Sequence, residues 1–174
     1  AKAMREGGAD AIVSTARFQG LVIDMNTLQP IMWGGYGGYG GPWQLPISLA
    51  WTAHIAKEKL GIPIIGSGGI STGEDIAKFI LVGAHATQVC TTILLHGLRI
   101  IERLIDELEL WMKKQGFTNL DEFRGMLLDK IKTLEELNRE KTLRVEIDMN
   151  KCKLCDICMH VCPYSAIKKI NDIL

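Results

Sequence analysis

Hydrophobic residues in the first two thirds of the chain follow two alternating patterns. Short continuous apolar runs have the length of buried strands, and longer segments repeat apolar residues every three or four positions, as amphipathic helices do. The predicted strands are residues 10–14, 62–66 and 86–91, and the predicted helices are residues 1–8, 47–60, 71–82 and 98–116. Strands that alternate with helices form a parallel sheet. The pattern therefore predicts an α/β domain.

Local signals mark the ends of several of these helices. Gly61, Gly83 and Gly116 follow the last periodic residues, where glycine commonly ends a helix. The helix over 71–82 begins with the capping-box spacing Ser71-x-x-Glu74. On the strands, we expect Ile12, Ile64 and Val89 to face the inside of a barrel and to be partly uncovered.

Residues 15–46 show no clear period and are predicted to be irregular. Their centre, residues 34–41, is rich in glycine, which is typical of a flexible linker. Aromatic side chains are uncommon in such linkers, yet they surround this one. We therefore predict an ordered loop that presses against a flat ligand. The aromatic residues are Trp33, Tyr36, Tyr39 and Trp43.

Two parallel-sheet architectures compete for this pattern. A doubly wound nucleotide-binding domain uses a G-x-G-x-x-G turn, which the residues after Gly66 do not supply. A (β/α)8 TIM barrel instead binds phosphate in the loops after its last two strands. Here small residues follow two successive strands, at 67–69 and 90–91. We predict the C-terminal part of a TIM barrel, without the first five strands, since a barrel needs roughly 250 residues.

A run of cysteines near the end of the chain predicts an iron–sulfur site. Cys152, Cys155, Cys158 and Cys162, followed by Pro163, have the spacing C-x2-C-x2-C-x3-C-P of bacterial ferredoxins. A structural zinc site normally pairs two distant C-x2-C units, and a disulfide pairing is the remaining alternative. The first three thiolates are predicted to share one cavity on a loop after a strand over 143–147. Cys162 either binds a second cluster or closes the first, at the start of a short helix over 163–168.

Composition limits the class of protein. The chain has 20 Lys and Arg residues against 20 Asp and Glu residues, which argues against an obligate nucleic-acid binder. No apolar run reaches the roughly 18 residues of a membrane span, and no signal peptide opens the chain. Four of the five cysteines lie in the metal run, which indicates a reducing compartment. We expect a cytoplasmic protein with no nucleic-acid or membrane partner.

Three segments together resemble one known family. Gly-Tyr-Gly-Gly-Tyr-Gly-Gly at 35–41, Ile-Ile-Gly-Ser-Gly-Gly-Ile at 64–70 and Gln-Val-Cys-Thr at 88–91 are similar to the dihydroorotate dehydrogenase-like FMN barrel family. Within that family, the order of the parts and the ferredoxin tail resemble the flavin and iron–sulfur subunits of dihydropyrimidine dehydrogenases. The resemblance divides the chain into barrel residues 1–116, a helical linker 117–142 and a 4Fe-4S ferredoxin-type module 143–174 that we expect to be incomplete.

The resemblance also implies a function and its cofactors. It implies a dehydrogenase acting on a CH–CH bond, with a dihydropyrimidine as the substrate. Electrons from NAD(P)H would arrive through an NAD(P)H/FAD partner subunit or domain and pass through 4Fe-4S clusters to FMN. It further implies an oligomer. The FMN-binding residues carried over are Gly41, Ser67, Gly68, Gly69, Cys90 and Thr91.

One departure weakens the assignment of a pyrimidine substrate. Ala16-Arg17 stands where the pyrimidine-reducing members carry Asn-Thr, and alanine lacks the donor and acceptor of an amide. Arg17 either pairs with a carboxylate substrate or lies in solvent. The family's catalytic acid or base falls outside the matched segments, so no catalytic residue is named. Two other functions stay open: a glutamate-synthase-like FMN enzyme with a ferredoxin tail, and an electron-transfer module alone.

Overall fold

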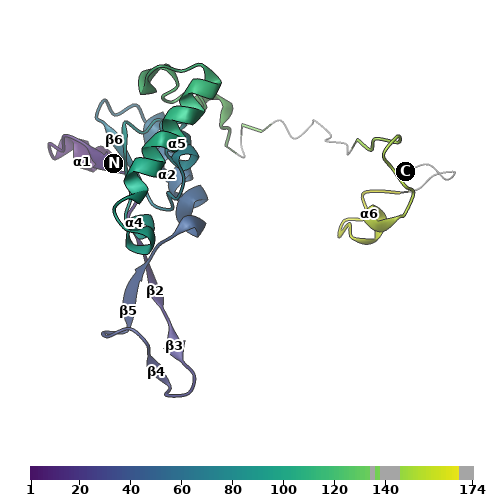
Figure 1. Cartoon of the computed structure of the whole chain (residues 1–174), viewed down its shortest axis with the longest axis horizontal. Coiled ribbons are helices and arrows are strands. Elements are labelled where there is room, and N and C mark those ends of the chain that lie inside the picture. Colours follow the sequence, from purple (N-terminus) through teal and green to yellow (C-terminus); the bar gives the residue numbers. More distant parts are fainter. Residues whose placement is uncertain (134–135, 138–145, 169–174) are drawn as a thin grey trace. The chain divides into compact units, whose positions relative to one another are not determined.

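The computed structural model describes residues 1–133, 136–137 and 146–168 (Figure 1). The chain separates into two compact units, Ala1–Lys132 and Thr133–Leu174. We describe each unit by itself. The boundaries predicted at 116 and 142 from the resemblance stay predictions.

The first unit is built on a parallel sheet of three strands. Strands β1 (Ile12–Val13), β6 (Ile64–Ser67) and β7 (Ala86–Gln88) lie in the order β1-β6-β7, with Ile12 opposite Ile64 and Ser67 opposite Gln88. The accompanying helices are α1 (Lys2–Glu6), α2 (Leu45–Lys57), α3 (Gly73–Leu81), α4 (Thr91–His96) and α5 (Ile100–Gln115). The predicted α/β alternation is confirmed, whereas α4 was not predicted.

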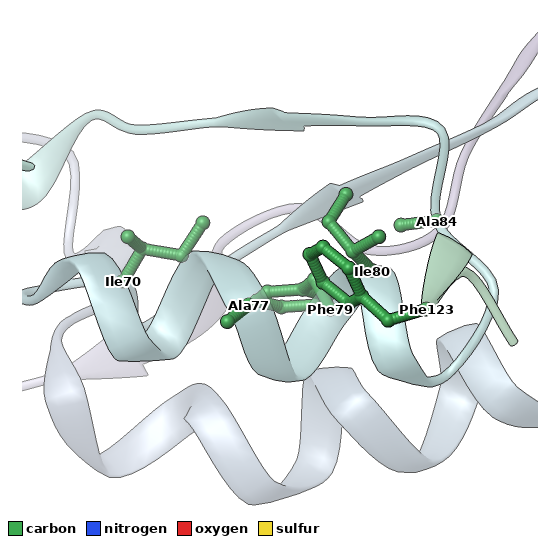
Figure 2. Close-up of a cluster of buried hydrophobic side chains, with 6 residues drawn as sticks. All are labelled: Ile70, Ala77, Phe79, Ile80, Ala84 and Phe123. Carbon is green, nitrogen blue, oxygen red and sulfur yellow. The ribbon is translucent and has the colours of Figure 1, made fainter. Parts of the chain in front are cut away.

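The hydrophobic core lies between the sheet and α3 and α5. Figure 2 shows its buried cluster, in which Phe79 and Ile80 from α3 meet Phe123 from the chain beyond α5. Gly66 on β6 makes room for this packing, because a Cβ there would lie 2.7 Å from Cγ of Phe79. A fully buried phenylalanine contributes about 2–3 kcal/mol through apolar surface removed from water.

The capping box of α3 lies one residue later than predicted. Thr72, not Ser71, is the N-cap, and its hydroxyl accepts a hydrogen bond from the backbone N–H of Asp75. The Asp75 carboxylate accepts in return from the backbone N–H of Thr72 at 3.0 Å. The short aspartate replaces the usual glutamate at the third helical position. Because Thr-x-x-Asp and Ser-x-x-Glu overlap here, spacing alone did not decide between them.

The strand residues that face the helices are not the ones that the sequence predicted. Ile12 and Ile64 are 2% and 6% exposed, whereas Val13 is 42% exposed. Alternate strand residues point to opposite faces, and Gly66, two positions after Ile64, faces Phe79 of α3. Ile12 and Ile64 therefore face the helices. The prediction that Ile12 and Ile64 lie inside the barrel and are partly uncovered was wrong, because it assigned them to the wrong face. Val89 is half-buried, as predicted, but it too packs against the buried cluster of α3.

Residues 18–39 form an antiparallel arm rather than an irregular loop. Strand β2 (Phe18–Leu21) pairs with β5 (Tyr36–Tyr39), and β3 (Ile23–Asp24) pairs with β4 (Gln29–Pro30). In Figure 1 this arm extends away from the helices and the parallel sheet. Its glycines hide the strand signal in the sequence, since glycine is depleted in strands.

Residues 117–130 belong to the first unit and pack against α3 and α5. Phe117 and Phe123 stack with ring centroids 5.0 Å apart, and Trp111 of α5 meets Phe123 edge-on at 5.2 Å. The backbone N–H of Gly125 donates to the carbonyl of Ile80 at 2.9 Å. This part of the predicted linker, which includes the short 3₁₀ helices Leu120–Glu122 and Leu128–Lys130, contributes to the core.

The second unit contains one described helix, α6 (Ile157–His160). The strand predicted over 143–147 lies partly outside the described residues, and residues 146–147 form no strand. The helix predicted over 163–168 is wrong, because Ser165 has a φ of 49°, which a right-handed helix cannot accommodate. In the described ranges of both units, no helix is long and apolar enough to cross a membrane.

Candidate functional site

The carboxyl ends of β6 and β7 meet at the edge of a cavity. Because the strands are parallel and Ser67 lies opposite Gln88, the turns that follow them are neighbours. The Thr92 hydroxyl donates to the carbonyl of Ile70 and ties the two turns together. Both turns line one cavity of about 260 Å³.

The turn after β6 exposes its backbone amides. Gly68 and Gly69 have φ values of 100° and 86°, which are accessible mainly to glycine. A Cβ at Gly68 would lie 2.6 Å from Oγ of Ser48, and one at Gly69 would lie 2.6 Å from Cα of Leu45. Only a residue without a side chain therefore fits this turn.

These amides are available to an anion. Within the described residues, the N–H groups of Gly68, Gly69 and Cys90 donate no hydrogen bond to the protein. The first amides of α4, from Thr91 onward, are likewise without a partner inside that helix. Convergent backbone donors beside small residues form a site for a phosphate. The residues present therefore fit the phosphate group of FMN.

A buried polar network holds the strand ends in place. The Gln44 side-chain amide donates to the carbonyl of Ala16 at 2.8 Å and to Oγ of Ser48 at 3.2 Å. The Thr15 hydroxyl donates to the carbonyl of Ser67 and lies 3.0 Å from Oγ of Ser48. Gln44 and Ser48 are both buried. The network joins the end of β1, the start of α2 and the end of β6.

The sequence analysis did not predict this network, although the spacing of its polar residues indicates it. Gln44, Ser48 and Thr52 are spaced by four residues, so they lie on one face of α2 and its preceding turn. All three are buried, and the Thr52 hydroxyl bonds to Oγ of Ser14 at 2.8 Å. A polar stripe at helical spacing can thus face the interior when strand ends supply partners.

All six residues predicted to bind FMN line the same cavity: Gly41, Ser67, Gly68, Gly69, Cys90 and Thr91. Their role in binding the flavin stays a prediction. None of the four aromatic residues predicted to press against a flat ligand lines this cavity. Trp33 is fully exposed on the arm, and Tyr39 and Trp43 stack on each other at 4.9 Å without lining the cavity.

The four cysteines of the second unit do not converge. Cys152, Cys155, Cys158 and Cys162 are free, and the described part of the chain contains no group of three or more side chains placed to hold a metal ion. The predicted shared cavity for the first three thiolates is therefore wrong for this structure. Metal binding energy is what draws such ligands together, so the spacing alone does not assemble the site.

The surroundings of these cysteines nevertheless suit thiolate ligands. The backbone N–H of Leu154 donates to the sulfur of Cys152 at 3.5 Å, and that of Ala166 donates to Cys162 at 3.4 Å. The N–H of Ala166, followed by that of Tyr164, lowers the pKa of the Cys162 thiol. Amides directed at sulfur favour the thiolate that a cluster requires. The donor set thus fits an iron–sulfur cluster.

Comparison with known proteins decides the family. Residues 1–112 match the family model described as dihydroorotate dehydrogenase. The chain belongs to the dihydroorotate dehydrogenase family. Residues 145–168 match the model of a 4Fe-4S binding domain. The predicted fold class, the C-terminal part of a TIM barrel followed by a ferredoxin-type module, is confirmed.

Individual members of the family share about a third of their aligned residues with this chain. The catalytic subunit of dihydroorotate dehydrogenase B (NAD(+)) from Thermococcus kodakarensis is 33% identical over 73% of this chain and 42% of that protein. The NAD-dependent dihydropyrimidine dehydrogenase subunit PreA from Escherichia coli K12 is 35% identical over 93% of this chain and 41% of that protein. The chain therefore spans about two fifths of the length of these relatives.

A solved structure supports the same conclusion. The dihydroorotate dehydrogenase from Eimeria tenella, crystallised with ferulenol, aligns with a TM-score of 0.57 at 28% identity. The alignment covers 71% of this chain and 32% of that one.

Proposed function

We propose that this chain is the flavin-binding and cluster-binding part of an oxidoreductase that acts on a CH–CH bond of a small cyclic substrate of the dihydropyrimidine type. One observation carries the proposal. The turn of Gly68 and Gly69 and the amides from Cys90 onward meet on one cavity, on a chain that also has a 4Fe-4S domain. A phosphate cradle and a cluster on one chain suit an enzyme that moves both electron pairs and single electrons.

Each part of the chain has a stated role in this proposal. The backbone amides of Gly68, Gly69, Cys90 and Thr91 hold the flavin phosphate, and Ser67 and Gly41 border it. FMN, when bound, supplies the two-electron chemistry that a CH–CH bond requires. Cys152, Cys155, Cys158 and Cys162 hold the cluster. A partner subunit or domain delivers electrons from NAD(P)H, in line with the NAD dependence in the names of two relatives.

The location and assembly of the protein belong to the same proposal. We place it in the cytoplasm, where cysteine thiols stay reduced and available as cluster ligands, and we expect it to act as an oligomer. The two alternatives predict different observations. An electron-transfer module alone would bind no flavin, and a glutamate-synthase-like enzyme would act on no dihydropyrimidine.

The test is anaerobic purification of the protein at its natural length. We expect a flavin absorbance spectrum, about four iron and four sulfide ions per chain, and reduction or oxidation of a dihydropyrimidine pair coupled to NAD(P)H. Counts near eight would indicate that Cys162 serves a second cluster. Absence of flavin would refute the enzyme and leave the electron-transfer module, and tightly bound zinc without sulfide would refute both.

A further inference from the structure

The cavity at the strand ends contains a single charged side chain. Of the described residues that line it, Arg17 alone carries a formal charge, and the others are apolar, amide, hydroxyl, thiol or glycine residues. Within the described part of the chain, the Arg17 guanidinium forms no ion pair and no hydrogen bond. The cavity therefore has an unmatched positive charge at its wall.

The backbone that carries Arg17 is held firmly. The buried Gln44 amide donates to the carbonyl of Ala16 at 2.8 Å, one residue before the arginine. The Thr15 hydroxyl, one residue further back, donates to the carbonyl of Ser67. Two successive residues are thus tied to α2 and β6, so the start of the Arg17 side chain is set by the network described above.

The Arg17 stem is directed across Gly38 of β5. A Cβ at Gly38 would lie 2.7 Å from Nε of Arg17, so the absence of a side chain there allows the arginine to lie across the strand. Gly38 also lines the cavity. The Arg17 side chain is exposed and lies across Gly38 at the cavity wall.

Arg17 shares this cavity with the phosphate cradle. Gly38, which the arginine crosses, is two residues before Gly40 on the arm, and a Cβ at Gly40 would be 3.3 Å from the Thr91 hydroxyl. The cradle itself offers neutral amides, so Arg17 adds the one formal positive charge among the described residues that line the cavity.

We propose that Arg17 is a specificity-determining residue that binds a carboxylate of the substrate, so that this enzyme selects anionic cyclic substrates. The inference rests on the proposed function and deepens it. A guanidinium offers parallel N–H donors that match a carboxylate in two hydrogen bonds. Within the described residues the guanidinium has no protein counter-charge, so a substrate carboxylate would supply its ionic partner.

The test compares two substrates that share a ring and differ by one carboxylate, dihydroorotate and dihydrouracil. In the natural-length enzyme, Arg17→Gln should raise KM for dihydroorotate about 10- to 100-fold and leave the kinetics with dihydrouracil unchanged. Arg17→Lys should restore part of the loss, because lysine keeps the charge but not the paired donors. Arg99→Gln is the control, since Arg99 is exposed and lies outside the cavity.

Two results would overturn this role for Arg17. Equal losses on both substrates would show that the residue is structural, and a fall in FMN content in Arg17→Gln would assign it to the flavin phosphate. If the wild-type enzyme turns over neither substrate, the proposed function fails, and calorimetric binding of orotate then tests the arginine separately. Orotate bound by wild type but not by Arg17→Gln supports carboxylate recognition, and no binding by wild type refutes it.

Discussion

Gly69→Ala should weaken the phosphate cradle, and the size of the effect can be estimated from the structure. Gly69 has a φ of 86°, where an L-residue pays roughly 1–2 kcal/mol. The added Cβ would also lie 2.6 Å from Cα of Leu45, which belongs to the backbone at the start of α2 and cannot rotate away. Overpacking of this kind costs about 1–3 kcal/mol. The total expected loss in the free energy of unfolding is about 2–5 kcal/mol.

Gly116→Ala is the matched control for this experiment. Gly116 ends α5 with a φ of 82°, and a Cβ there would meet no atom within 4 Å. It carries the same conformational cost without the overlap, so the loss should stay at roughly 1–2 kcal/mol. The difference between the two variants therefore measures the packing against α2.

The assay is a urea titration of stability together with a fluorescence titration of FMN into the flavin-free protein. A displaced turn loses at least one amide contact to a charged phosphate, about 1.5–3 kcal/mol, so FMN should bind about 10- to 100-fold more weakly in Gly69→Ala. In Gly116→Ala the affinity should be unchanged. Equal FMN affinities in the two variants would show that the turn after β6 does not hold the phosphate.

Three further predictions concern the core, the cluster and one histidine. Phe123→Ala should lower the free energy of unfolding of the barrel unit by about 3–5 kcal/mol in a urea titration, because Phe123 is fully buried; a loss below 1 kcal/mol would contradict its place in the core. Cys155→Ser should lower iron and sulfide counts and abolish NAD(P)H-linked turnover while FMN stays bound; full turnover would show that the cluster is dispensable. His85 accepts a hydrogen bond at Nδ1 from the N–H of Ile64, and burial, followed by the charge of Arg124, lowers its pKa. Because the pKa of His85 is lower in the folded protein, the unfolded chain takes up a proton first as the pH falls. The stability that neutral His85 contributes to the folded protein is therefore complete above a pH of about 6.5 and is lost below it. Urea titrations at several pH values should show that the free energy of unfolding depends less on pH in His85→Gln than in wild type. An equal pH dependence would contradict the assignment of this proton uptake to His85.

Local patterns were enough to predict the α/β alternation and the presence of a 4Fe-4S domain. Apolar runs and helical periods located β1, β6, β7, α2, α3 and α5 to within a few residues, because burial of one face imposes a period on the sequence. The Cys-x2-Cys-x2-Cys-x3-Cys spacing identified a 4Fe-4S domain for the same kind of reason, since one short loop must supply several thiolates to one cube.

Two of the errors arose where the structure of one segment depends on another, and a third arose from a local backbone angle. The antiparallel arm was missed because Gly37 and Gly38 of β5 gain their strand geometry only from pairing with β2. The face of Ile12 and Ile64 was wrong because two-residue and four-residue strands contain too few positions to reveal which side meets the helices. The helix over 163–168 was wrong because a single backbone angle at Ser165 interrupts it.

By itself, the sequence determined the class of fold, the family and the residues at the two strand ends, since these depend on local periodicity and spacing. Only the tertiary structure showed that Gln44, Ser48 and Thr15 tie the strand ends together, and that Arg17 is the charged residue on the cavity wall. Those relations join residues up to 52 positions apart. No local pattern encodes them, because they follow from which turns the parallel pairing of β1, β6 and β7 brings side by side.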